Sequence, residues 1–333
     1  NERIEIPGIP ERGCFSVTLD VPDVGSDYAF VATAPVFTRR GSAPTPFGCT
    51  DVNSPECSEL AAKLGFSYVR HFTGWSGLEP QRGRYRFDGI GRTIDANVAA
   101  GLRPWISLQG APSWALPQGM FGFGFEPAPV DMQAWAGVVT AVSRRFKGKL
   151  YGWEWLNEIV PGGKCEDPVA TYLEMCRQGT AAAKAVDPNL EIQLAGGLWP
   201  HNFRIDLLNA GVGRLIDVLP VHYANYSSVD EAWRDLRARG LDKVGVIDNE
   251  SASGMSVWNM NAEQTLAMSV NQCLHVMTHW PDVLCAGATR VVYFGGQPNA
   301  AGNWSYLLDA RTPRPVAVTL AVVQGKLAYA KPV

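Results

Sequence analysis

The sequence of 333 residues has little charge and no block of one sign. Only 18% of its residues are charged, and the formal net charge is −3 at pH 7. Proteins that bind nucleic acid carry basic patches that neutralise phosphates, and no basic block is present here. No apolar run reaches the length of a membrane-spanning helix. The sequence therefore argues against nucleic-acid and membrane partners.

Cysteine is sparse, and the seven cysteines match no metal-binding spacing. Cys49 and Cys57 are close enough in sequence to form a disulfide, as are Cys165 and Cys176, and the odd total leaves at least one thiol free or paired elsewhere. The chain begins NERIEIPG, which is not a signal peptide, although a mature protein would have lost one. The compartment is weakly constrained, with a secreted or periplasmic location favoured.

Tryptophan, by contrast, is abundant, with eleven residues. Flat indole faces suit the apolar faces of sugar rings, although a Trp-rich core explains any single tryptophan equally well.

Two stretches of the sequence have the pattern of a strand with a polar end: Tyr151–Glu158 reads YGWEWLNE and Lys243–Glu250 reads KVGVIDNE. Each has the composition of a buried strand and closes on Asn-Glu. An α/β barrel places its chemistry at such polar strand ends.

The order of strand and helix patterns predicts the fold. Residues 1–46 contain the β-like runs CFSVTLDV and YAFVATAPVF and a Gly/Ser/Pro-rich segment, which predict a β-rich N-terminal extension and linker. From 47 to 333 strands and helices alternate, which indicates a parallel sheet closed by helices. The predicted strands cover 47–50, 66–70, 103–108, 151–158, 191–197, 216–224, 243–250 and 289–296. Eight strands in this alternation predict a (β/α)8 TIM barrel as the catalytic domain.

The C-terminal ends of the predicted strands supply the candidate site. They carry Arg70, His71, Gln109, Asn157, Glu158, His222, Tyr223 and Glu250. This set has no nucleophilic cysteine, no Ser-His-Asp order and no glycine-rich phosphate loop, so we predict no cofactor. Hydrolysis of a sugar needs two carboxyl groups that face each other across the glycosidic bond, one protonated and one ionised. We therefore expect a carbohydrate as the partner of this site.

Neighbouring groups can be assigned supporting roles. Arg70 would favour the ionised form of Glu250 if it reaches that carboxylate. Asn157 cannot titrate and could hold a sugar hydroxyl. His71 is open between substrate contact and packing. Glu154 is expected deeper in the barrel as a structural, paired group.

Metal chemistry is disfavoured. His275 and His279 stand four residues apart on a predicted helix, but no Glu lies between them and the helix is expected on the barrel exterior. The strand ends were also expected to lack a cluster of histidines and carboxylates, which makes a metal-dependent isomerase a weak alternative. We predict no metal.

The stretch Trp153-Glu154-Trp155-Leu156-Asn157-Glu158 resembles the E-x-x-N-E signature of the clan A retaining glycoside hydrolases, over roughly residues 47–330. Within the clan the chain looks most like family 39, with family 5 next. The resemblance implies that Glu158 is the general acid/base and Glu250 the nucleophile. It also implies that Arg70, His222 and Tyr223 match clan positions, with Tyr223 bonded to the nucleophile.

Aromatic residues beyond the strand ends are candidate sugar contacts. Trp199, Trp258 and Trp304 are predicted to bind substrate, Trp75 and Trp114 are placed similarly, and GMFGFGF is interpreted as a platform over the cleft. We expect a retaining β-glycoside hydrolase. The alternatives are a transglycosylase with the same residues and a carbohydrate-binding barrel without catalysis. The sugar, its linkage and the oligomeric state are open.

Overall fold

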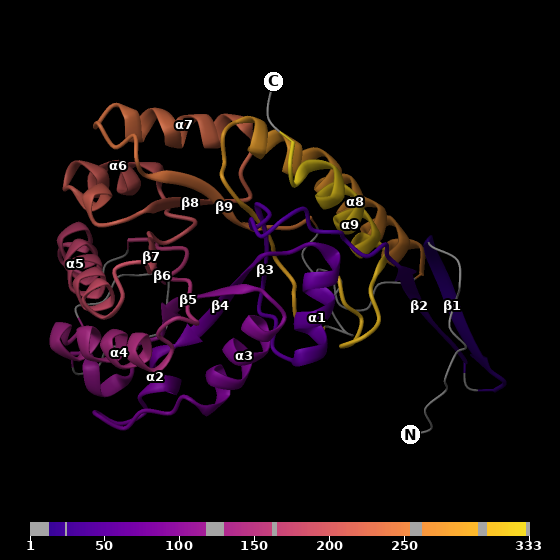
Figure 1. The fold of residues 1–333 in the computed structure, drawn as a ribbon, viewed down its shortest axis with the longest axis horizontal. Coiled ribbons are helices and arrows are strands. Elements are labelled where there is room, and N and C mark those ends of the chain that lie inside the picture. The colour runs from indigo at the N-terminus through magenta and orange to yellow at the C-terminus, as the bar shows by residue number, and fades with distance from the viewer. Residues whose placement is uncertain are drawn as a thin grey trace.

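A computed structural model describes residues 13–23, 25–117, 130–161, 165–253, 262–298 and 305–330. Within them eight parallel strands close into a barrel in the order β10-β3-β4-β5-β6-β7-β8-β9 (Figure 1). The barrel strands are β3 (Phe47–Thr50), β4 (Tyr68–Gly74), β5 (Arg103–Gln109), β6 (Gly152–Trp155), β7 (Glu191–Gln193), β8 (Val218–His222), β9 (Gly245–Ser251) and β10 (Val291–Tyr293). The predicted TIM barrel is thus confirmed.

Helices alternate with these strands and cover the outside of the barrel (Figure 1). They are α1 (Pro55–Leu64), α2 (Trp75–Leu78), α3 (Asp88–Ala99), α4 (Met132–Arg145), α5 (Pro168–Val186), α6 (His201–Asn209), α7 (Tyr226–Arg237), α8 (Ala262–Cys285) and α9 (Pro315–Leu327). Side chains of Ser54, Asp131, Asp167 and Asn225 cap α1, α4, α5 and α7 by accepting backbone N–H groups. These caps are encoded locally, which is why most helix starts were predictable.

Helix α8 is longer than the sequence predicted. We expected it to end at Thr278, but it continues through Pro281 to Cys285. Trp280 and Val283 are fully buried in this last part, and the Trp280 ring stacks on Phe47 with ring centroids 4.9 Å apart. Burial of these side chains against the barrel outweighs the hydrogen bond that proline cannot make.

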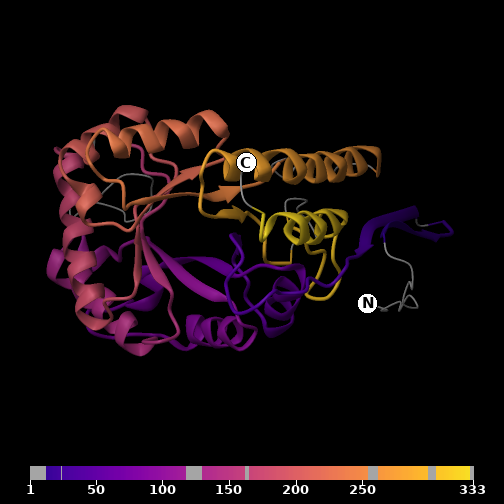
Figure 2. The same cartoon turned by 45° about the horizontal axis from the view of Figure 1, so that its top comes forward.

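The N-terminal extension forms an antiparallel hairpin of β1 (Gly13–Val21) and β2 (Gly25–Thr33). Its base lies against the C-terminal part of the chain, where Ala32 donates its N–H to the carbonyl of Pro313 at 2.8 Å. The rest projects away from the barrel on the side of α8 and α9 (Figure 2). The predicted β-like runs are therefore strands, although the second ends at Thr33 rather than continuing toward Phe37.

All seven cysteines are free. The two pairs that are close in sequence, Cys49 with Cys57 and Cys165 with Cys176, are not bridged, and these four residues are buried thiols. Sequence proximity was a poor guide because a disulfide also needs matched Cβ directions. None of the helices in the described ranges has the length and apolar character to cross a membrane.

Candidate active site

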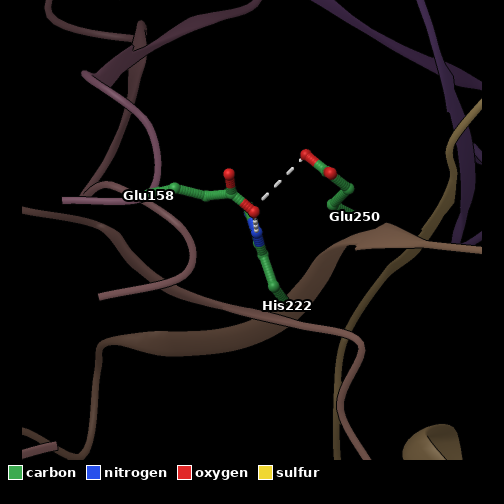
Figure 3. Close-up of side chains that lie close together, drawn as sticks. All are labelled: Glu158, His222 and Glu250. Atoms are coloured by element: carbon green, nitrogen blue, oxygen red, sulfur yellow. Dashed lines mark hydrogen bonds and ion pairs between the residues drawn. The ribbon is translucent and has the colours of Figure 1, made fainter. Parts of the chain in front are cut away.

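Two carboxylates and a histidine meet at the C-terminal end of the barrel. Glu158 follows β6, His222 ends β8 and Glu250 lies near the end of β9. One ligand-type atom from each lies within 4.8 Å of the others, so the two carboxylates approach to within that distance (Figure 3). The Glu158 side chain is 37% exposed and that of Glu250 is 8% exposed. Residues 92 positions apart thus share one solvent-accessible site.

The turn after β6 places Glu158. Trp153 and Trp155 are fully buried and fix the strand, which ends at Trp155. Leu156 and Glu158 then adopt left-handed backbone, with φ of 65° and 47°. This conformation is uncommon for side chains with a Cβ and is often found at functional sites. We predicted a strand through Glu158; instead the tight turn lifts its carboxylate out of the strand and into the mouth of the barrel.

The carboxylate of Glu250 is held on both oxygens. Nη1 of Arg70 donates to Oε2 at 2.7 Å, and the hydroxyl of Tyr223 donates to Oε1 at 3.0 Å. Burial alone would lower the pKa of Arg70, but the carboxylates of Glu154 and Glu250 raise it above its usual value. The guanidinium is therefore a permanent positive charge that forms an ion pair with the carboxylate of Glu250.

Glu154 connects the parts of the site from below. It is fully buried and accepts two bonds from Arg70, from Nε and Nη2, each at 2.7 Å. It also accepts from Nδ2 of Asn249 at 2.9 Å and from the N–H of Gly196 at 3.2 Å. This satisfies a charge that would otherwise be costly to bury. The expected structural role of Glu154 agrees with these contacts.

Nδ1 of His222 lies 3.3 Å from Oε1 of Glu158. An ionised carboxylate only accepts hydrogen bonds, so the imidazole must donate here. This bond is the largest influence on the Glu158 carboxyl and holds its pKa below the usual value, against the opposing effect of partial burial. The direction is opposite to that of a general acid in an apolar pocket. In the free enzyme His222 therefore favours the basic form of Glu158.

Replacing His222 with Phe removes this donor and should raise the pKa of Glu158. A general acid is active while protonated, so the basic limb of the pH profile of kcat/KM should move to higher pH. The profile is measured with an aryl glycoside. His201→Phe is the matched control, because His201 bonds Arg204 on α6 and should leave the limb in place. A basic limb that stays, or moves to lower pH, in His222→Phe contradicts this assignment.

Gly196 and Gly197 shape the site, and sequence reasoning missed them. A Cβ on Gly196 would lie 2.1 Å from Nε2 of His222 and 2.3 Å from Oδ1 of Asn249. A Cβ on Gly197 would lie 2.7 Å from Nδ1 of His222 and 2.9 Å from Cγ of Glu158. The His222 ring can therefore reach Glu158 only because both residues lack a side chain. The signal was the pair of glycines at the end of a predicted strand.

We expect Gly196→Ala to lower kcat/KM by roughly 10- to 100-fold, because a displaced His222 would misplace Glu158. The melting temperature should also fall, because the added Cβ clashes with the fully buried side chain of Asn249, which bonds Glu154. Gly89→Ala on α3 is the matched control, because a Cβ there meets nothing within 4 Å. Kinetics and thermal melts of both variants test this. Unchanged kcat/KM in Gly196→Ala, with a native melt, contradicts the proposed packing.

Asn157 and His71 were both candidate substrate contacts, but only Asn157 lies in the site. Oδ1 of Asn157 accepts a bond from Nη2 of Arg70, so Asn157 belongs to the cluster. His71 does not: it is buried, its Nε2 lies 2.7 Å from Oδ1 of Asn97 on α3, and burial lowers its pKa to about 4. Successive residues of a strand face opposite sides, so Arg70 inside the barrel puts His71 outside. Of the two roles left open for His71, substrate contact and packing, the structure therefore favours packing.

The tryptophans predicted beyond the strand ends differ in how exposed they are. Trp199 is 67% exposed beside the site, whereas Trp75 is fully buried and donates from Nε1 to Glu79. Trp114 is half-buried and packs edge-on against Trp75. Trp75 therefore cannot stack on a sugar. Trp258, Trp304 and the GMFGFGF run lie outside the described residues.

Asp51 is a further residue that the sequence did not reveal. It follows β3 with a φ of 50°, and its Oδ1 accepts the N–H of Phe72 at 3.2 Å. Burial raises the pKa of Asp51 to about 6, with Arg70 opposing this rise and Glu250 adding to it. Asp51 thus lies within electrostatic reach of the site. The predicted strand 47–50 has the same bounds as β3, so the signal was the acidic residue that directly follows this strand.

The group of Glu158, His222 and Glu250 has the spacing of a possible metal site. The sequence did not predict such a cluster, which forms because the His222 ring folds over Gly196. Both oxygens of Glu250 already accept bonds, from Arg70 and Tyr223. A metal would have to compete with a buried guanidinium for this carboxylate. These contacts suit an ion-paired carboxylate better than a metal ligand.

Comparisons with known proteins show which solved structures share this fold. No model of a protein family matches the chain. A family 39 glycoside hydrolase from Bacteroides cellulosilyticus WH2 is similar, with a TM-score of 0.70, 18% identity, and coverage of 96% of this chain and 72% of that one. The exo-β-1,4-mannosidase Op5Man5 from Opitutaceae bacterium strain TAV5 has a TM-score of 0.59 and 18% identity, with coverage of 90% and 64%.

A GH5_18 protein from Streptomyces cattleya, solved with Manβ1-4GlcNAc, has a TM-score of 0.65 and 15% identity, with coverage of 87% and 82%. The neighbours thus include glycoside hydrolases of families 39 and 5, the two families that the sequence resembles. At these identities the likeness shows the fold. The chain thus shares the (β/α)8 barrel fold with these glycoside hydrolases.

Proposed function

We propose that this protein is a retaining β-glycoside hydrolase. The observation that carries the proposal is the approach of Glu158 and Glu250 to within 4.8 Å in one accessible site. Retaining enzymes hold their carboxyl groups about 5–5.5 Å apart, whereas inverting enzymes leave about 6.5–9.5 Å for a water molecule. The short separation supports double displacement. It also counts against a carbohydrate-binding barrel without catalysis, for which facing acids have no use.

The first step uses both acids. Glu250, ionised beside Arg70 and oriented by Tyr223, attacks the anomeric carbon. Protonated Glu158 donates its proton to the leaving oxygen as the glycosidic bond breaks. A glycosyl-enzyme ester forms on Glu250, and the aglycone leaves as an alcohol. Arg70 keeps Asn157 in place, where its amide can hold a sugar hydroxyl.

The second step reverses the role of Glu158. Its carboxylate takes a proton from water, the water oxygen attacks the anomeric carbon, and the bond to Glu250 breaks. A low pKa of Glu158, held down by His222, suits this step. The first step needs the protonated acid, so we expect the free enzyme to be most active on the acid side of neutrality.

The fold neighbours guide the choice of substrates. They include an exo-β-1,4-mannosidase and a protein solved with Manβ1-4GlcNAc. The panel should hold 4-nitrophenyl β-glycosides of mannose, glucose, galactose and xylose, together with β-1,4-linked disaccharides. Product analysis with an added sugar acceptor separates hydrolysis from transglycosylation, which would use the same residues.

The decisive test of the proposal is the configuration of the first product. Proton NMR during early turnover should show the β-anomer before it mutarotates, because two inversions give net retention. An α-anomer as the first product would exclude double displacement. Absence of turnover across the whole panel would count against glycosidase activity itself.

A further inference from the structure

We propose that Trp199 forms the leaving-group side of the site and selects substrates whose aglycone is a flat ring, either a second sugar or an aryl group. This inference rests on the proposed function, because it depends on Glu158 being the group that protonates the leaving oxygen. The inference places Trp199 on the aglycone side of the glycosidic bond, and it predicts that good substrates carry a flat ring in the aglycone.

The two acids define the two sides of the cleft. Glu250 must reach the anomeric carbon, and Glu158 must reach the oxygen of the departing group. Chain segments that bond to the backbone at Glu158 therefore border the aglycone. The segment between β7 and α6 meets this description, because the N–H of Glu158 donates to the carbonyl of Gly196 at 2.8 Å.

Trp199 is fixed to the segment that carries the acid. Its N–H donates to the carbonyl of Ile159 at 3.0 Å, directly after Glu158 in the sequence. Two residues before Trp199, the Cβ position of Gly197 lies 2.9 Å from Cγ of Glu158. The backbones of the two segments thus pair on both sides of the acid. A group bonded to the leaving oxygen would lie beside this pair.

Exposed apolar side chains gather on this side. Trp199 is 67% exposed and Val160, on the facing segment, is 39% exposed. Tyr223 and Tyr226 follow β8 and are also exposed. Single exposed hydrophobic residues are normal. Trp199 and Val160, however, lie on two backbone segments that pair beside the acid, whereas the hydroxyl of Tyr223 bonds the nucleophile Glu250. Phe72, within β4, is half-buried, and its ring face is already covered by the guanidinium of Arg70, which lies 4.5 Å from the ring centroid.

A flat ring is the partner that an exposed indole fits best. Its face offers a large apolar area at little cost in conformational entropy, because the side chain has only two rotatable bonds. A pyranose or an aryl ring covers that face, whereas a fluoride leaving group is too small to touch it. The contribution of Trp199 should therefore depend on the leaving group and vanish for fluoride.

The test compares two substrates that share a glycone. The glycone is the sugar whose 4-nitrophenyl β-glycoside the enzyme cleaves, and the substrates are its β-1,4-linked disaccharide and its β-glycosyl fluoride. Trp199→Ala should lower kcat/KM for the disaccharide roughly tenfold or more. It should leave kcat/KM for the fluoride within about twofold. Trp199→Phe, which keeps a flat ring, should restore most activity on the disaccharide.

Tyr329→Ala is the control, because Tyr329 is an exposed aromatic residue at the end of α9, where its hydroxyl accepts the N–H of Arg40. It should leave both substrates unaffected. Equal losses on disaccharide and fluoride in Trp199→Ala, or no loss on either, overturn the inference while the enzyme remains a glycosidase. If the unmodified enzyme hydrolyses no fluoride or aryl glycoside, the proposed function fails first, and this inference with it.

Discussion

Replacing Glu250 with Ala is expected to lower kcat on aryl glycosides by roughly 10⁴- to 10⁶-fold, because it removes the carboxylate proposed to form the covalent intermediate. Arg70 and Tyr223, which bond its two oxygens, would be left facing an empty position. The rate is followed by release of 4-nitrophenol. Thermal melting should show that the variant is folded, since Glu250 lies at the end of β9 rather than in the apolar core.

A rescue experiment sharpens this prediction. Azide is small enough to enter the space that the side chain leaves, and it should restore turnover and give a product of inverted, α configuration. Glu59→Ala is the matched control, because Glu59 is an exposed carboxylate on α1 that pairs only with Lys63 at 3.7 Å. Full activity in Glu250→Ala without azide would end the proposal that Glu250 is the nucleophile.

The second large effect is on stability. Arg70→Met should lower the free energy of unfolding by about 3–5 kcal/mol, because it leaves the buried carboxylates of Glu154 and Glu250 without their cation. Activity should be lost as well, since the same guanidinium bonds Asn157 and Glu250. Urea denaturation followed by circular dichroism measures the stability.

Arg82→Met provides the comparison. Arg82 pairs with Asp131 at the same N–O distance of 2.7 Å, but its side chain is 59% exposed, so its loss should cost less than about 1 kcal/mol. Arg70→Lys should recover only part of the stability, because an ammonium cannot reproduce the fork that bonds Glu154 through two nitrogens. Equal, small losses in Arg70→Met and Arg82→Met would show that the buried pairs contribute little.

Much of the fold was predictable from the sequence. The strand–helix alternation indicated the barrel, and the rule that strand ends gather at one face brought Glu158 and Glu250 together before any coordinates. The strands that carry them are apolar up to a polar ending, so the pattern marked both the element and the functional residue. Arg70 and Tyr223 were found in the same way.

The remaining features depend on contacts between distant segments. Gly196 is required because the His222 ring fills the space that a side chain at position 196 would need. His222 is distant in the sequence, so the local pattern around Gly196 does not reveal this contact. His71 could have been placed correctly, because alternation along a strand puts it on the face opposite to Arg70. Disulfide pairing was left open by the sequence, because closeness in sequence says little about direction in space. The β6 strand ends at Trp155 because Leu156 and Glu158 adopt left-handed backbone, which a strand cannot continue through.

The most direct test is to trap the covalent intermediate. The enzyme is incubated with a 2-deoxy-2-fluoro β-glycoside that has a dinitrophenyl leaving group, using the sugar identified by the substrate panel, and is then digested and examined by mass spectrometry. The account predicts one added fluorosugar per chain, attached through Glu250. A label on any other residue, or no label on an enzyme that still cleaves the parent glycoside, would contradict it.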